Sequence, residues 1–467
     1  MVQTGKVRPL SQKLALALLP LFPLFAGATQ LEEAIKSAQL SGLLQIKFHN
    51  YTRIKDTAGN KVEYNGWERH AHLKFGLPVD ENLKFYWQFA SDGVDYSKSI
   101  VSGDQPYWGD NSTGDANLVT QLLYFDYHNS YGGVTAGKMP VKTPITSGDP
   151  VWINYGVGTA VYLKPAEGLT ISAGWVDKLF GAKGPTDIMT AYDEVVYVDT
   201  DQNFDKTGDP TAIGDTAIDD DIFWGAIQYT GENWKGEVWY FNLPHVIQYE
   251  WVARVSGEYQ VSFGKLKGGV DFAQSRLDNH LYWVYNPGDY ENGNFMILTD
   301  TSEADATAAG KEIVNDWKPK NYFHIYAGLD TDRWGGKVGY ARTTDRTGFL
   351  SLDPYSPLND IFGTEQIKGL TNMGSYHGGF GIALYSNLYY RWSSQFKNYF
   401  NIVRIKEGGT FIAVEWKIGA TYRYNKRVEM GAYFDNTNYG AMARTPGPTG
   451  NNPANVQEWE AEVTYRF

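Results

Sequence analysis

One run of carboxylates in this chain has a spacing that could bind calcium. Carboxylate or amide residues occupy positions 199, 201, 203 and 205 within the stretch 198–209, which is how an EF-hand loop begins. That loop also needs Gly at its sixth position and Glu at its twelfth, where this chain has Phe204 and Pro210. We therefore interpret 198–209 as an acidic surface loop.

Catalytic residue patterns are missing from the sequence. His70 and His72 are two residues apart, so they point the same way if the segment is a strand. No H-E-x-x-H and no G-x-S-x-G motif occurs, and these are the patterns of zinc proteases and serine hydrolases. The chain has no cysteine, which excludes disulfides and thiolate zinc sites. We do not expect an enzyme, although a membrane phospholipase could assemble Ser and His across strands.

The elements around these residues read as strands. In GTFIAVEWKIGATYRY (409–424) and in the terminal EWEAEVTYRF (458–467), apolar and polar residues alternate, which puts them on opposite faces of an extended strand. A soluble β-sandwich would bury the apolar face against a second sheet, whereas an outer-membrane barrel turns it to lipid and lines a wet lumen with the charged face. Strands of about ten residues with aromatic ends favour the barrel.

Connection lengths support the same fold. Short links at 79–82, 129–133, 165–168, 230–233, 331–336 and 424–427 alternate with long stretches at 93–117, 142–158, 179–220, 277–320, 343–376 and 439–455. Short periplasmic turns and long outer loops are typical of bacterial barrels. We predict an all-β, antiparallel transmembrane barrel of 18 strands, with 16 as the alternative. Wall side chains alone do not fill so wide a lumen, so something else must narrow it.

The amino terminus predicts export. Basic residues Lys6, Arg8 and Lys13 precede an apolar run from Leu14 to Phe25 and then Ala-Gly-Ala, which is the order of a secretory signal peptide. We expect a signal peptide at 1–28 and a barrel domain at 29–467. No later apolar run has the length of a membrane helix.

The charge balance bears on partners. Without the expected leader, 38 basic residues face 53 acidic ones, a net charge of −15. This balance argues against nucleic acid as a partner and favours a pore that prefers cations. A substrate-specific channel and a surface adhesin stay open as alternatives.

The start of the expected mature chain resembles the Campylobacter-type major outer membrane porins. ATQLEEAIK (28–36), followed by LSGLL, carries the resemblance, and AGK (136–138), YGVGTA (155–160) and EGLTISAGWVD (167–177) extend it in order. The resemblance implies a homotrimer of 18-stranded barrels in the bacterial outer membrane, in contact with its lipids, that passes small hydrophilic solutes and ions. It also implies an in-folded loop with a calcium ion near the constriction.

The same resemblance implies where calcium would bind. The in-folded loop corresponds to 142–158, where Asn154 stands at a ligand position that is Asp in the family, with Asp149 upstream. A second ligand position falls on Asp187, and a third, from a later loop, on Asp353, with Asp360 as the fallback. Because a neutral amide oxygen binds Ca²⁺ more weakly than a carboxylate does, the substitution by Asn implies a weaker site.

Overall fold

The computed structural model describes residues 37–54, 61–96, 118–147, 153–180, 217–218, 221–244, 247–277, 282–285, 297–299, 312–314, 319–344, 350–353, 355–365, 367, 381–407, 410–439 and 455–467. The signal peptide expected at 1–28 lies outside these residues and stays a prediction. In the part of the chain that the structure describes, no helix is long and apolar enough to cross a bilayer.

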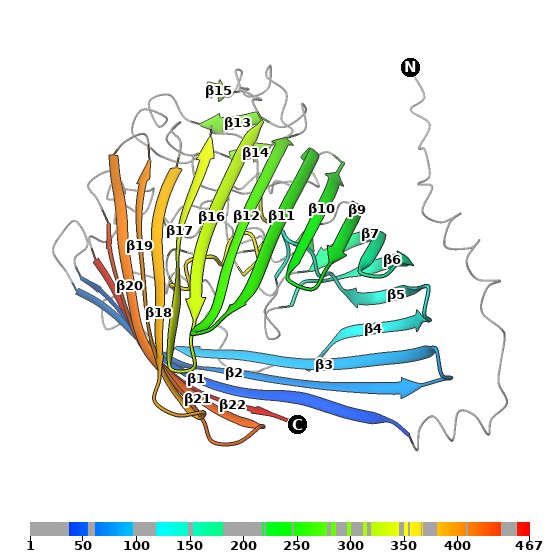
Figure 1. The fold of residues 1–467 in the computed structure, drawn as a ribbon, viewed down its shortest axis with the longest axis horizontal. Helices are drawn as coiled ribbons and strands as arrows, with labels where there is room; N and C mark the ends of the chain where they lie inside the picture. Colours follow the sequence, from blue (N-terminus) through cyan, green and yellow to red (C-terminus); the bar gives the residue numbers. More distant parts are fainter. Residues whose placement is uncertain are drawn as a thin grey trace, which may run out of the picture.

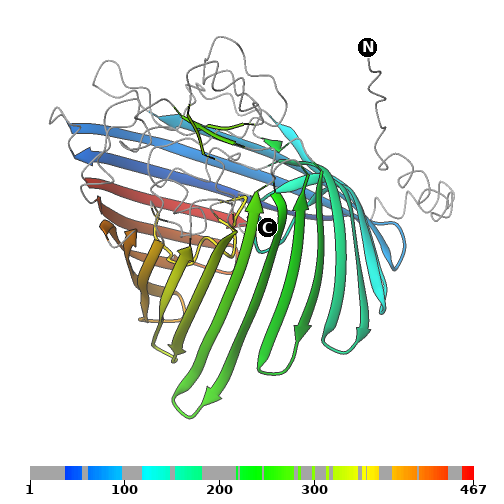
Figure 2. The ribbon, with the colours of Figure 1, turned by 90° about the horizontal axis from the view of Figure 1, so that it is seen from above.

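Eighteen strands form one closed antiparallel barrel (Figures 1 and 2). The first nine wall strands are β1 (Gln39–Ile54), β2 (Lys61–Pro78), β3 (Leu83–Tyr96), β4 (Val119–His128), β5 (Gly132–Pro140), β6 (Tyr155–Ala166), β7 (Leu169–Phe180), β9 (Ile222–Thr230) and β10 (Trp234–Leu243). The other nine are β11 (Ile247–Val261), β12 (Gly264–Leu277), β16 (Lys320–Asp330), β17 (Trp334–Thr344), β18 (Gly381–Arg391), β19 (Phe396–Glu407), β20 (Thr410–Arg423), β21 (Val428–Tyr439) and β22 (Asn455–Arg466). The prediction of 18 strands is confirmed.

Four short strands do not belong to the wall. The two-residue strand β8 (Ala217–Ile218) pairs with the end of β7. The strands β13 (Tyr282–Tyr285), β14 (Ile297–Thr299) and β15 (Glu312–Val314) form a separate small sheet within the long connection between β12 and β16.

The barrel closes where β1 meets β22. Twelve residues of β1, from Leu43 to Ile54, pair antiparallel with β22 from Arg466 back to Asn455. Backbone hydrogen bonds between Gly42 and Phe467 extend this pairing to the last residue. The terminal strand has to alternate like the others because it forms one side of this closing seam.

All six predicted short links fall at tight turns between wall strands, and two more turns join β11 to β12 and β18 to β19.

The two faces of each strand differ as the alternation predicts. On β22, Trp459 is 58% exposed and Val463 46%, whereas Glu458 and Glu460 are 8% and 7% exposed. Trp67 pairs with Phe48 on the same outer face, with ring centroids 5.1 Å apart. The apolar residues therefore face outward, and the charged residues face the lumen.

Two chain segments lie against the inner wall of the barrel. One is 141–147, between β5 and β6. The other, which we call the inner segment, comprises residues 350–353, 355–365 and 367 between β17 and β18, and appears in yellow inside the ring of strands in Figure 2. Their buried apolar side chains pack with inward residues of the wall into one core that includes Leu122, Met139, Val141, Ile145, Phe241, Leu350, Leu352, Leu358, Ile361 and Phe362.

The loop expected at 142–158 to enter the barrel is thus shorter, because β6 already begins at Tyr155. The expectation of an in-folded loop is confirmed. The inner segment was not expected inside the barrel, because its sequence predicts an outer loop at 343–376 that only contributes a calcium ligand. Backbone hydrogen bonds join the two inward segments, from Leu352 N to Ile145 O at 2.8 Å and from Leu358 N to Pro144 O at 3.1 Å.

Candidate functional site

A row of inward-facing polar side chains on neighbouring strands holds the backbone of the inner segment. Tyr322 on β16 donates its hydroxyl to Leu358 O at 3.3 Å, and Lys337 on β17 donates to Ile361 O at 3.0 Å. Asn387 on β18 donates to the carbonyl of Phe362, and Asn401 on β19 donates to that of Gly363 at 2.5 Å. Buried carbonyl groups need such partners because water no longer reaches them. The row therefore fixes the path of the segment along the wall.

Glu415 and Lys417 on β20 continue this row. The Glu415 carboxylate, which is fully buried, accepts hydrogen bonds from the backbone N–H groups of Glu365 at 2.7 Å and Ile367 at 2.6 Å. Lys417 forms an ion pair with the side chain of Glu365. Both residues belong to the charged face of 409–424, and this arrangement agrees with the expectation that the charged face lines the lumen.

Asn154 connects the two inward segments. Its Nδ2 donates to Asp353 Oδ2 at 3.0 Å, and its Oδ1 accepts from the backbone N–H of Ser147 at 2.5 Å. Asn154 and Asp353 are each 2% exposed. Two of the four predicted calcium ligands are therefore side by side, although 199 residues separate them in the chain.

The orientation of Asn154 matters for calcium. A cation needs the amide oxygen, since the amide nitrogen is only a donor, and here the nitrogen faces Asp353. In this orientation a hydrogen bond links Asn154 to Asp353, and we call this pair the hydrogen-bonded tie. Asp149 and Asp187 lie outside the described residues, and the fallback Asp360 follows the turn that begins at Ser356. Calcium ligation by this set stays a prediction.

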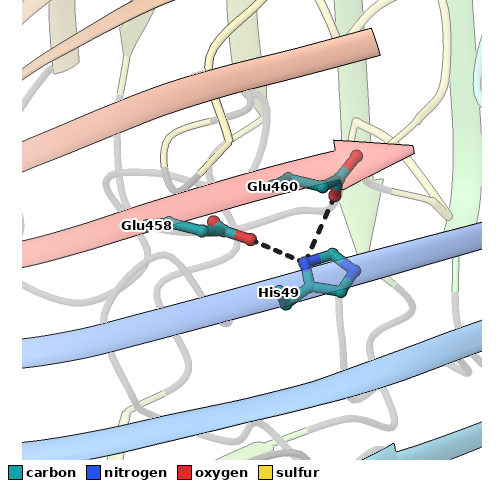
Figure 3. Close-up of side chains that lie close together, drawn as sticks. All are labelled: His49, Glu458 and Glu460. Atoms are coloured by element: carbon teal, nitrogen blue, oxygen red, sulfur yellow. Dashed lines mark hydrogen bonds and ion pairs between the residues drawn. The ribbon is translucent and has the colours of Figure 1, made fainter. Parts of the chain in front are cut away.

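Carboxylates gather on the lumen side of the closing seam. We call Glu68, Glu458, Glu460 and Glu462, on β2 and β22, the acidic seam. Their side chains flank two inward residues of β1: Lys47, 3.7 Å from Glu460, and His49. Figure 3 shows His49 pointing at Glu458 and Glu460 across the β1–β22 pairing, at 3.0 and 3.2 Å.

The predicted histidine pair also faces the lumen beside this seam. His70 and His72 are 2% and 5% exposed, and His70 Nε2 lies 3.4 Å from Glu68 Oε2. Their common facing follows the strand period of two.

A different part of the inner wall carries a lysine among aromatic rings. Lys74 on β2 lies 4.4 Å from the ring centroid of Tyr86 and 5.5 Å from that of Tyr124, and it donates to the Tyr124 hydroxyl at 3.1 Å. The two tyrosine rings stack, with centroids 5.0 Å apart. The lumen thus has a surplus of carboxylates at the seam and a cation–aromatic group on β2–β4.

Comparison of the sequence with family models shows to which family this protein belongs. The model described as "Campylobacter major outer membrane protein" matches residues 7–273, more than half of the chain. The chain belongs to this family. The resemblance inferred from the start of the expected mature chain is confirmed, and so is the outer membrane as the location of this major outer membrane protein.

Solved structures share the fold of this family member. Pseudomonas aeruginosa OccK5 (OpdH) matches with a TM-score of 0.57 at 11% identity, covering 92% of this chain and 98% of that one. Acinetobacter baumannii OccAB4 gives 0.59 at 9% identity over 92% and 98%. P. aeruginosa OpdK, crystallised with vanillate, gives 0.58 at 11% identity over 92% and 99%. No curated protein matched the chain.

The residues that sequence reasoning missed are those that hold the inner segment, such as Asn387, Asn401 and Glu415. One signal was present in FLSLDPYSPLNDIFG (349–363), where Leu350, Leu352 and Phe362 belong to an apolar set too dense for a solvated loop. The partners on the wall carry no comparable signal, because polar residues at inward positions are common to every porin strand.

Proposed function

We propose that this outer membrane channel is a water-filled, cation-preferring porin through which small hydrophilic solutes diffuse passively. The observation that carries the proposal is the acidic seam. Four carboxylates line the inner wall where β1 closes on β22, beside Lys47 and His49. Fixed negative charges on the wall of a narrow aqueous path raise the local concentration of cations and lower that of anions. Channel family and fold support passage through the barrel; an enzymatic role is not part of the proposal.

The reversal potential in planar bilayers under a salt gradient tests this directly. We expect a potential of the sign that indicates cation preference. The double variant Glu458→Gln/Glu460→Gln should lower the cation-to-anion permeability ratio by about twofold, since two wall charges are lost while the side-chain size is kept. Glu232→Gln, in the exposed turn between β9 and β10, is the matched control and should leave the ratio unchanged. An anion-preferring wild-type channel would refute the proposed selectivity.

We further propose that the functional unit is a homotrimer and that a structural Ca²⁺ holds the constriction, with Asp187, Asp353 and Asp149 or Asn154 as ligands. The contact between Asn154 and Asp353 supports the calcium site because it brings two segments with ligand positions together inside the lumen. Light scattering of the detergent-extracted protein measures the oligomeric state. Recovery of the monomer alone under mild extraction would contradict the trimer.

A substrate-specific channel is the second candidate. The group of Lys74, Tyr86 and Tyr124 favours it, because an ammonium beside aromatic faces suits an aromatic carboxylate, and one structural neighbour was crystallised with vanillate. Saturable block of the ion current by vanillate, lost in Lys74→Gln, would support this candidate. A current that is independent of vanillate would leave general diffusion.

A further inference from the structure

His49 lies in a position that a simple ion pair does not explain. Its Nδ1 is 3.0 Å from Glu458 Oε1 and 3.2 Å from Glu460 Oε2 (Figure 3). Its Nε2 is 3.2 Å from Glu68 Oε2. A ring nitrogen carries at most one hydrogen, yet Nδ1 faces two carboxylate oxygens. The buried Nε2 makes no hydrogen bond of acceptable geometry with any described residue. Oxygen atoms thus surround the imidazole from two strands.

The spacing of these atoms fits a metal coordination sphere. One ligand atom each from His49, Glu458 and Glu460 lie within 4.8 Å of one another. Zinc binds imidazole nitrogen and carboxylate oxygen at about 2.0–2.2 Å, so neighbouring ligand atoms around one ion are roughly 3.0–3.5 Å apart. The two Nδ1 contacts, 3.0 and 3.2 Å, fall in this range.

The backbone pre-forms this arrangement. His49 and Glu460 are directly opposite each other in the antiparallel β1–β22 pairing, and Glu458 is the diagonal neighbour on the same face. Such neighbours have Cβ atoms close enough to share an interaction. The side chains of His49, Glu458 and Glu460 are 13%, 10% and 7% exposed, so a bound ion would be largely desolvated. The Tyr433 hydroxyl lies 3.3 Å from Glu458 Oε1 and 3.0 Å from Glu460 Oε2, so its one hydrogen bonds either carboxylate and helps to orient the pair.

The local charge also favours a cation. The acidic seam has four carboxylates, and Lys47 lies 3.7 Å from one of them, Glu460. Close carboxylates repel each other strongly where water is excluded. A divalent ion would offset this repulsion and would connect the first strand of the barrel to the last.

We propose that His49, Glu458 and Glu460 form a binding site for a divalent transition-metal cation such as Zn²⁺, on the lumen side of the seam that closes the barrel. The imidazole sets the choice of ion. Ca²⁺ and Mg²⁺ take oxygen ligands, whereas imidazole nitrogen suits Zn²⁺ and its neighbours in the first transition series. This site is separate from the proposed calcium site, which uses residues of the inward segments.

Titration calorimetry of the detergent-extracted full-length protein with Zn²⁺ tests the site. Excess Ca²⁺ is present throughout, so that oxygen-only sites are occupied. We expect His49→Ala and the isosteric Glu460→Gln each to weaken the tightest Zn²⁺ binding by at least about tenfold, since the first removes a ligand and the second replaces a carboxylate by a weaker, neutral amide oxygen. The matched control is His128→Ala. His128 lies on β4 with one carboxylate, Asp126, at 3.6 Å, so its loss should leave binding unchanged.

Thermal unfolding gives a second readout. Zn²⁺ should raise the melting temperature of the wild type and of His128→Ala but not of the two site variants, because only an ion bound to the folded seam stabilises it. Equal Zn²⁺ affinity in wild type and His49→Ala would overturn the proposal, as would displacement of Zn²⁺ by Ca²⁺ or wild-type protein that binds no Zn²⁺. None of these outcomes bears on cation selectivity, which is measured without Zn²⁺.

Discussion

Single side chains of the inner wall supply hydrogen bonds that water supplies in an open pore. Glu415 is the clearest case, since its buried carboxylate takes two backbone N–H groups from the inner segment. Hydrogen bonds from a charged group are stronger than neutral ones, and a buried donor left unpaired costs about 1–3 kcal/mol. Such residues therefore act by holding the inner segment in place, and the place of the segment sets where the lumen is narrow.

Glu415→Gln should loosen the inner segment. The amide has only one oxygen, so one of the two backbone donors loses its acceptor, and we expect about 1–3 kcal/mol of lost stability. Thermal unfolding measures this loss, and single-channel conductance should rise or become noisier. Glu232→Gln again serves as control. Wild-type melting and conductance in Glu415→Gln would mean that the segment is held elsewhere.

Asp353→Asn separates the hydrogen-bonded tie from the proposed calcium site. If Asp353 only accepts hydrogen bonds, from Asn154 and from the backbone N–H of Tyr355, the substitution should lower the melting temperature equally in calcium and in chelator. If Asp353 also binds Ca²⁺, the loss should be larger in calcium, because the ion stabilises only the folded wild type. We expect the second result, and likewise for Asp187→Asn. Identical melting of the wild type in calcium and in chelator would remove the ion from the account.

At the scale of elements, the inner segment is a chain of turns adapted to the wall strands. Gly363 has a φ of +68°, a conformation that costs residues with a Cβ atom more than it costs glycine. A Cβ atom there would also lie 2.9 Å from the Nδ2 atoms of both Asn387 and Asn401. Glycine at this position lets the backbone approach the two asparagines that hold it.

Gly363→Ala should therefore release part of the segment. We expect a loss of about 1 kcal/mol or more from the backbone conformation alone, with further loss if the asparagines are displaced. Gly225→Ala on β9 is the matched control, since its nearest atom would be 3.9 Å away and its backbone is extended. Melting temperature and conductance are the measurements. Equal effects of the two variants would contradict the role given to Gly363.

At the scale of the whole molecule, the barrel is a sheet with lipid outside and a polar, partly filled lumen inside. Ile418 is 49% exposed on the outer face of β20, while Thr421 on the same strand points to the lumen with Lys417. The two faces therefore respond differently to the same charge. Charged side chains are tolerated on the lumen face, where water and counter-charges are present, and are excluded from the lipid-facing surface.

Ile418→Arg should cost about 2–4 kcal/mol if this position lies near the middle of the bilayer. Thr421→Arg should cost much less, because its side chain enters the lumen. Reversible unfolding in lipid vesicles measures both. Equal losses from the two substitutions would contradict the assigned facing.

The sequence by itself determined the barrel. Alternating apolar and polar residues show that each strand has one face toward lipid and one toward the lumen, and alternating short and long connections distinguish the two ends of the barrel. It also predicted the inward position of Glu415 and of the His70 and His72 pair. Only the tertiary structure decided which distant residues meet. Asn154 and Asp353 are 199 residues apart, and His49 reaches Glu460 only when the first strand closes on the last. The sequence of a single strand does not distinguish one inward polar residue from another. Their partners depend on which strands and segments become neighbours when the barrel closes.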